Sequence, residues 1–257
     1  GSAEPDLILA SGAIASGLAP LATPARLEDL AAAMVCGRLP ETGPRPVWFI
    51  PGLHTLSGPV GLHNCEAMDR LEGEETAAMG FAQGFAGPAV LAFVGAESRY
   101  LHLDEGLGVS GSVTTLSGQL FDALAGLTGL TEASPLDAEM LAIGSRQSAD
   151  FGLGRSAFLV WLLDRFCPYS RGAKRSLLLG AVLGADLQTL KNSRAIRMNP
   201  VSRFVISGEP WLAEALAKLV EADEFFSGTV SVIPDTKAGL AARGALAVAR
   251  ARGLVPG

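Results

Sequence analysis

The chain has 257 residues, of which 49% are hydrophobic and 18% are charged, so it is long enough to bury one large core or two modest ones. Its formal net charge of −6 and its pI near 5.1 argue against nucleic-acid binding and against a polybasic membrane-binding patch. Its longest apolar stretches, such as residues 177–187, are interrupted by glycine or by charge before they reach the length of a membrane span.

The cysteines and histidines show neither a disulfide framework nor a metal-ligand spacing. The cysteines, an odd number without a C-x-x-C pair, are Cys36, Cys65 and Cys167. The histidines are His54, His63 and His102. The first residues also lack the basic and apolar segments of a signal peptide. We therefore expect a reduced, cytoplasmic protein without a nucleic-acid or membrane partner.

Predicted strands and helices alternate in the first half of the chain. Strands are predicted at residues 6–10, 47–50, 89–94, 100–103 and 108–114, and helices at 27–35, 74–81 and 117–127. The run 89–94 is apolar throughout, which is typical of a strand covered on both faces. Residues 104–106 (DEG) predict a hairpin turn, and Ser117 is expected to cap the helix that follows it.

The second half is more helical. Helices are predicted at residues 136–143, 156–164, 175–191, 211–220 and 235–252, and strands at 203–206 and 229–233. Residues 168–174 (PYSRGAK) have the composition of a linker. The alternation predicts right-handed crossovers, parallel strand pairing and an α/β fold. We expect a first lobe at residues 1–110 and a second lobe at 111–257.

Short segments rich in glycine and polar residues stand at the ends of several predicted elements. They are Pro51-Gly52, Gly73 to Thr76 (GEET), Val94 to Tyr100 (VGAESRY), Thr114 to Leu120 (TTLSGQL), Gly180 to Asp186 (GAVLGAD) and Val205 to Gly208 (VISG). Taken singly, each has a structural interpretation: a turn, carboxylates at a helix start, a hairpin, a capped helix, helix packing, or a strand end.

In this order, the segments resemble the 2-dehydro-3-deoxygalactonokinase family of sugar-acid kinases. The family patterns at four of the segments are R-G-E-E-T, P-G-T-H-[SC]-K-W, T-x-x-T-G-E-L and G-L-L-I-G-A-E, and the resemblance extends from Asp6 to Ala249. It implies an actin/hexokinase-like (ribonuclease H-like) two-lobe α/β fold. It also implies phosphorylation of a 2-keto-3-deoxy sugar acid with ATP and Mg²⁺.

The resemblance implies a role for each segment. The catalytic residues would be Glu74, Glu75 and Gln119, with Glu75 also binding the metal. The nucleotide would contact Gly95, Ser98, Arg99, Gly184 and Gly208, although packing against a helix is an alternative for Gly184. The sugar acid would contact Pro51, Gly52, Thr76 and Thr114.

Four positions depart from the family patterns. Glu72 replaces an arginine, Ala96 a threonine, Glu97 a histidine and Gln119 a glutamate. Carboxylates beside a polyphosphate are unfavourable, and an amide cannot take a proton from an acceptor hydroxyl. The D-W-G-T-type phosphate loop of the family also has no counterpart, because no D-x-G-[ST] run occurs in the sequence.

Three interpretations therefore stay open. The chain is a sugar-acid kinase of weak activity, a pseudokinase that acts as a binding or regulatory module, or a fragment that a partner chain completes. A first lobe without its first strands would expose an unpaired sheet edge. We therefore expect a homo-oligomer or a complementing chain.

Overall fold

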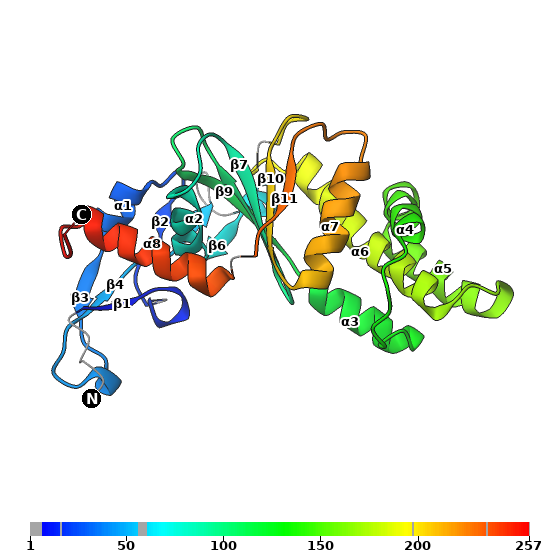
Figure 1. Ribbon diagram of the computed structural model, residues 1–257, viewed down its shortest axis with the longest axis horizontal. Coiled ribbons are helices and arrows are strands. Elements are labelled where there is room, and N and C mark those ends of the chain that lie inside the picture. Colours follow the sequence, from blue (N-terminus) through cyan, green and yellow to red (C-terminus); the bar gives the residue numbers. More distant parts are fainter. Residues whose placement is uncertain (1–6, 16, 56–60, 197, 235, 257) are drawn as a thin grey trace. The chain divides into compact units, whose positions relative to one another are not determined.

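The computed structural model describes residues 7–15, 17–55, 61–196, 198–234 and 236–256 (Figure 1). The chain forms two compact units. The first combines residues 1–89, 101–113 and 235–257, and the second combines residues 90–100 and 114–234. Whether functional lobes follow the division expected near residue 110 stays a prediction.

The first unit contains two small sheets of three strands each. One sheet has the order β1 (Ile8–Ala10), β4 (Val47–Phe49), β3 (Val35–Gly37), and the other has the order β2 (Leu21–Ala22), β5 (Leu53–Thr55), β6 (Asp69–Leu71). In each sheet the central strand pairs in parallel with one neighbour and antiparallel with the other. The helices of this unit are α1 (Leu27–Ala32), α2 (Glu74–Ala82) and α8 (Lys237–Ala251), and the 3-10 turns are η1 (Gly12–Ala15), η2 (Pro40–Thr42) and η3 (Cys65–Ala67).

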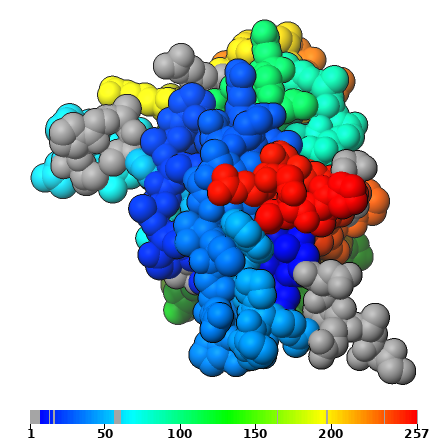
Figure 2. Space-filling model, turned by 90° about the vertical axis from the view of Figure 1, so that its left-hand side faces the viewer, coloured from blue at the N-terminus to red at the C-terminus, as the bar shows by residue number. Residues whose placement is uncertain are grey.

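Helices α2 and α8, which are far apart in sequence, lie side by side in the first unit (Figure 1). Their backbones meet at two glycines. A Cβ atom at Gly244 would lie 1.7 Å from the carbonyl oxygen of Thr76, and one at Gly80 would lie 1.9 Å from that of Leu240. Beyond α8, Arg252 donates a hydrogen bond of 3.3 Å to the carbonyl oxygen of Ala32. The end of the chain accordingly lies against the N-terminal segment in Figure 2.

A five-stranded sheet has the order β11 (Val230–Val232), β10 (Phe204–Gly208), β7 (Ala89–Val94), β8 (Ser98–Leu103), β9 (Val109–Thr115). Strand β10 runs parallel to both β7 and β11. All six residues of β7 are buried, as expected for a strand covered on both faces.

The helices of the second unit are α3 (Ser117–Thr128), α4 (Ala138–Phe151), α5 (Leu153–Phe166), α6 (Arg171–Asn192) and α7 (Pro210–Ala222). The apolar residues of α6 are mostly buried, and it packs closely on α4. In the described part of the chain, no helix combines the length and the apolar character that a membrane crossing needs.

The predicted α/β class, the parallel pairing of β10 with β7 and β11, and the hairpin between β8 and β9 are confirmed. Three local predictions are wrong. Helix α1 ends at Ala32, and Val35 lies in strand β3, because β3 pairs with β4. The segment 168–174 is not a linker, since the Ser170 side chain accepts a hydrogen bond from the N–H of Ala173 and starts α6. Ser117 does not cap α3, because its hydroxyl donates to Asp186 instead.

The glycine contact between α2 and α8 predicts a large cost for Gly244→Ala. The added methyl group would overlap the backbone of α2, so the helices must separate, and we expect a loss of about 3 kcal/mol in the free energy of unfolding. Urea denaturation measures this loss. The control is Gly126→Ala in α3, where no heavy atom lies within 4 Å of the added Cβ, so stability should stay the same or rise slightly. Equal stability of both variants would contradict the close contact.

Candidate functional site

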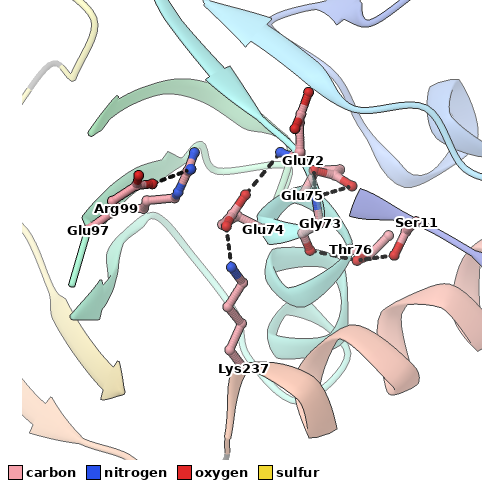
Figure 3. Close-up of polar contacts among 9 residues, drawn as sticks. All are labelled: Ser11, Glu72, Gly73, Glu74, Glu75, Thr76, Glu97, Arg99 and Lys237. Carbon is pink, nitrogen blue, oxygen red and sulfur yellow. Dashed lines mark hydrogen bonds and ion pairs between the residues drawn. The ribbon is translucent and has the colours of Figure 1, made fainter. Parts of the chain in front are cut away.

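The start of α2 forms a compact acidic turn in the first unit (Figure 3). Gly73 precedes the helix with φ of 113°, a conformation that favours glycine. Its N–H donates to both carboxylate oxygens of Glu75, at 3.0 and 2.8 Å, and the N–H of Glu72 donates to Glu74 at 3.0 Å. The two carboxylates therefore bind backbone N–H groups at the helix start, where the helix dipole favours negative charge.

Lys237 completes this turn from the first residue of α8. Its ammonium group donates to Glu74, whose side chain is only 3% exposed (Figure 3). The sequence interpretation did not include Lys237, because 163 positions separate the two residues. One local signal existed: a lysine in the first turn of a helix opposes the helix dipole, and such a residue often has a specific partner.

Backbone contacts bring the other predicted residues of the first unit to the same place. Thr76 is buried and donates to the carbonyl oxygen of Gly73 at 2.7 Å. A Cβ atom at Gly52 would lie 2.3 Å from the carbonyl oxygen of Leu71, so the Pro51-Gly52 turn contacts the strand that leads into the acidic turn. The structure thus groups five predicted site residues of this unit: Pro51, Gly52, Glu74, Glu75 and Thr76.

Glu72, which stands where the family pattern has an arginine, pairs with Arg70 at 2.7 Å. The neighbouring basic residue therefore offsets the charge of this substitution.

The acidic turn does not fit a magnesium site. Glu75 is fully buried and both its oxygens accept from Gly73, while Glu74 is paired with Lys237. Across the described ranges, no group of three or more His, Cys, Asp or Glu side chains is arranged to hold a metal ion. The contacts of the two carboxylates are those of side chains that stabilise the start of a helix.

In the second unit, three glycine-containing segments meet at the carboxyl end of β7. A Cβ atom at Gly118 would lie 2.2 Å from the carbonyl oxygen of Gly95, and one at Gly208 would lie 2.0 Å from that of Val94. Gly208 has φ of 124°, which again favours glycine. The N–H of Gln119 donates to Ala96 at 3.0 Å, and the N–H of Glu209 donates to Val94 at 2.9 Å. The N-termini of α3 and α7 therefore converge on one strand end.

The turn after β7 contains the charged substitutions. Glu97 and Arg99 form an ion pair of 2.7 Å (Figure 3), so the basic residue expected to bind phosphate already has an acidic partner. The Ser98 hydroxyl is buried and makes no hydrogen bond of ordinary geometry with the described residues. The Gln119 side chain is exposed, and Thr114 is half-buried.

Gly184 lies apart from this strand end, within α6. A Cβ atom there would lie 2.6 Å from the Cα atom of Ser145 in α4, so the position is a helix–helix contact. A contact of Gly184 with a nucleotide stays a prediction.

A buried carboxylate fixes the start of α3. Asp186 accepts hydrogen bonds from Tyr100 at 2.8 Å, from Thr115 at 3.0 Å and from Ser117. These donors come from β8, β9 and α3, whereas Asp186 belongs to α6. The sequence interpretation assigned no role to Asp186. An acidic residue inside the apolar run 177–187 was the available signal, since such a group must find partners when it is buried.

Burial raises the pKa of two buried carboxyl groups, those of Glu75 and Asp186. It raises the pKa of Glu75 from 4.5 to about 7, opposed by the Gly73 hydrogen bonds. It also raises the pKa of Asp186, opposed by its three hydroxyl donors, of which Ser117 has the largest effect. The pKa of Tyr100 rises because the residue is buried and lies beside Asp186.

A family model described as 2-keto-3-deoxy-galactonokinase matches residues 4–243. The fold is also similar to the crystal structure of a Sinorhizobium meliloti protein named as a candidate 2-dehydro-3-deoxygalactonokinase. The two share 20% sequence identity with a TM-score of 0.71, over 92% of this chain and 74% of that one. No curated protein matches the chain. The kinase-like α/β fold expected from the sequence is thereby confirmed.

The raised pKa of Glu75 predicts that stability falls as pH rises. The folded protein retains a proton that the unfolded chain releases above pH 4.5, so the free energy of unfolding should decrease between about pH 4.5 and 7, by about 3 kcal/mol. Glu75→Gln should remove most of this dependence of the free energy of unfolding on pH, and the variant should be more stable than the parent at pH 8. Urea denaturation across this pH range measures both effects. Glu28→Gln, at an exposed position in α1, should keep the parent slope; an unchanged slope in Glu75→Gln would contradict the assignment.

The Asp186 network predicts that Asp186→Ala loses at least ~2 kcal/mol in the free energy of unfolding, because three hydroxyl groups lose their acceptor. Asp186→Asn keeps one acceptor oxygen and should lose less. Asp150→Ala, an exposed change in α4, should stay within about 0.5 kcal/mol of the parent. Chemical denaturation distinguishes the three variants, and parent-like stability of Asp186→Ala would show that the network is dispensable.

Proposed function

Because the chain belongs to the 2-keto-3-deoxy-galactonokinase family, we propose that it binds ATP and slowly phosphorylates a 2-keto-3-deoxy sugar acid. The observation that carries this proposal is the convergence of Gly95, Gly118 and Gly208 at the end of β7. Phosphate groups bind where backbone N–H groups are accessible and helix dipoles are positive. Two helix N-termini, with the positive ends of their dipoles, lie at this strand end, and its glycines carry no side chains.

The proposed reaction is a phosphoryl transfer. An oxygen of an acceptor hydroxyl forms a bond to the γ-phosphorus of ATP, the bond from that phosphorus to the β–γ bridging oxygen breaks, and ADP leaves. The hydroxyl proton passes to solvent, because the Gln119 amide can orient a hydroxyl but cannot take its proton. In the first unit, Pro51, Gly52 and Thr76 are the proposed contacts of the sugar acid, and Thr114 is a proposed contact in the second.

Three features support slow transfer. Gln119 lacks the basicity of a carboxylate, Glu97 adds negative charge to the turn after β7, and Arg99 is paired with Glu97. Losing one preorganised group that stabilises charge typically costs on the order of 10²- to 10³-fold in rate. The same three residues favour a second candidate function, a pseudokinase that binds nucleotide as a regulatory signal without transferring phosphate.

Gln119→Glu distinguishes the two functions. If transfer is limited by the missing base, the variant should release ADP at least tenfold faster than the parent with a panel of 2-keto-3-deoxy sugar acids. Both proteins should bind ATP in calorimetry. The control Asn192→Asp makes the same amide-to-acid change at an exposed position of α6 and should leave the rate unchanged.

The remaining outcomes are separable. ATP binding without ADP release by the parent and by Gln119→Glu would support the pseudokinase. Absence of ATP binding in both proteins would contradict both functions.

A further inference from the structure

The second unit contains a pocket that none of the proposed kinase residues line. It has a volume of about 330 Å³ and lies among α4, α6, α7 and the turn that follows α7. Residues Ala142, Leu219 and Phe225 give it an apolar wall, and the rest of its lining is largely polar.

The pocket is separate from the strand end proposed to bind ATP. Gly208 precedes the N-terminus of α7, whereas the pocket contacts the last turn of that helix, at Leu219 and Ala222. A helix of 13 residues is roughly 20 Å long, at 1.5 Å per residue. A molecule in this pocket would therefore lie well away from Gly208.

One ion pair in the pocket wall is already used by the fold. Lys191 pairs with Asp223, and its ammonium group lies 5.8 Å from the ring centroid of Phe225 and 5.7 Å from that of Phe226. Asp223 also accepts a hydrogen bond of 2.9 Å from the N–H of Phe225. These contacts hold the turn after α7 and fix one side of the pocket.

Four other polar side chains line the pocket with no hydrogen bond or ion pair to any described residue. They are Ser145, Arg146, Gln188 and Glu224. Together they offer one positive charge, one negative charge, a hydroxyl and an amide. Since Lys191 and Asp223 neutralise each other, the groups left for a ligand carry equal and opposite charges.

We infer that this pocket binds a free α-amino acid with an aliphatic or aromatic side chain. The guanidinium of Arg146 suits the carboxylate, because its planar N–H groups can bind both oxygens. The carboxylate of Glu224 suits the ammonium group. Leu219 and Phe225 provide apolar surface for the ligand side chain.

Charge complementarity distinguishes this ligand from simpler molecules. A carboxylic acid without the amine could pair with Arg146, but it would bring its negative charge near Glu224 with no ammonium group to offset it. An amine without the carboxylate would leave Arg146 unpaired and face its positive charge. A zwitterion satisfies both groups.

Isothermal calorimetry without nucleotide tests the inference on the full chain. L-leucine and L-phenylalanine are the probes, and 4-methylpentanoate and 3-methylbutylamine are the leucine analogues that lack one charged group each. We expect at least one amino acid to bind, and each analogue to bind at least tenfold more weakly than leucine or not at all. No binding of either amino acid, or equal binding of an analogue, would overturn the inference.

Two variants locate the site. Arg146→Gln and Glu224→Gln change exposed side chains and should each weaken amino-acid binding at least tenfold while the circular dichroism spectrum stays unchanged. The controls are Arg155→Gln in α5 and Glu139→Gln in α4, which remove the same charges at exposed positions outside the pocket and should bind as the parent does. Parent-like binding by Arg146→Gln and Glu224→Gln would place the amino acid elsewhere. None of these results depends on kinase activity.

Discussion

The second unit depends on how closely three backbone segments approach one strand end. Residues with a Cβ atom at Gly118 or Gly208 would overlap the carbonyl groups at the end of β7. The start of α3 is held there by the hydrogen bond from Ser117 to Asp186. The buried carboxylate and the lack of a side chain at Gly118 therefore both contribute to the position of this helix. As a result, the N-termini of α3 and α7 lie at the same strand end. The dipoles of these two helices would favour the binding of an anionic ligand at this strand end.

Several charged side chains of the predicted site segments are paired within the protein. The acidic turn of the first unit uses its carboxylates internally, on the N–H groups of Glu72 and Gly73 and on Lys237. Arg99 is likewise occupied by Glu97. Charges that the sequence pattern suggests for substrate and nucleotide are thus committed to partners within each unit. Binding a substrate through them would require exchange of these contacts, which has an energetic cost.

Sequence patterns among neighbouring residues predicted much of the fold. The apolar run of β7, the amphipathic helices and the hairpin before β9 follow from neighbouring residues, and the structure has them. The short strands β2, β3, β5 and β6 were not predicted, because pairing partners and not propensity determine them. The same limit applies to the site. Motif order grouped Glu74, Glu75 and Thr76, whereas Lys237 and Asp186 act through contacts with residues distant in the chain.

The contact between α2 and α8 has a consequence for biosynthesis. The whole second unit lies within residues 90–234, and these residues leave the ribosome before α8 does. Helix α2 of the first unit is translated before residues 90–234, yet its contact with α8, at Thr76 and Gly244, forms only after those residues have been made. The segments of the first unit that precede residue 90 therefore complete their packing only after the second unit has been translated, and until then the face of α2 that contacts α8 stays exposed.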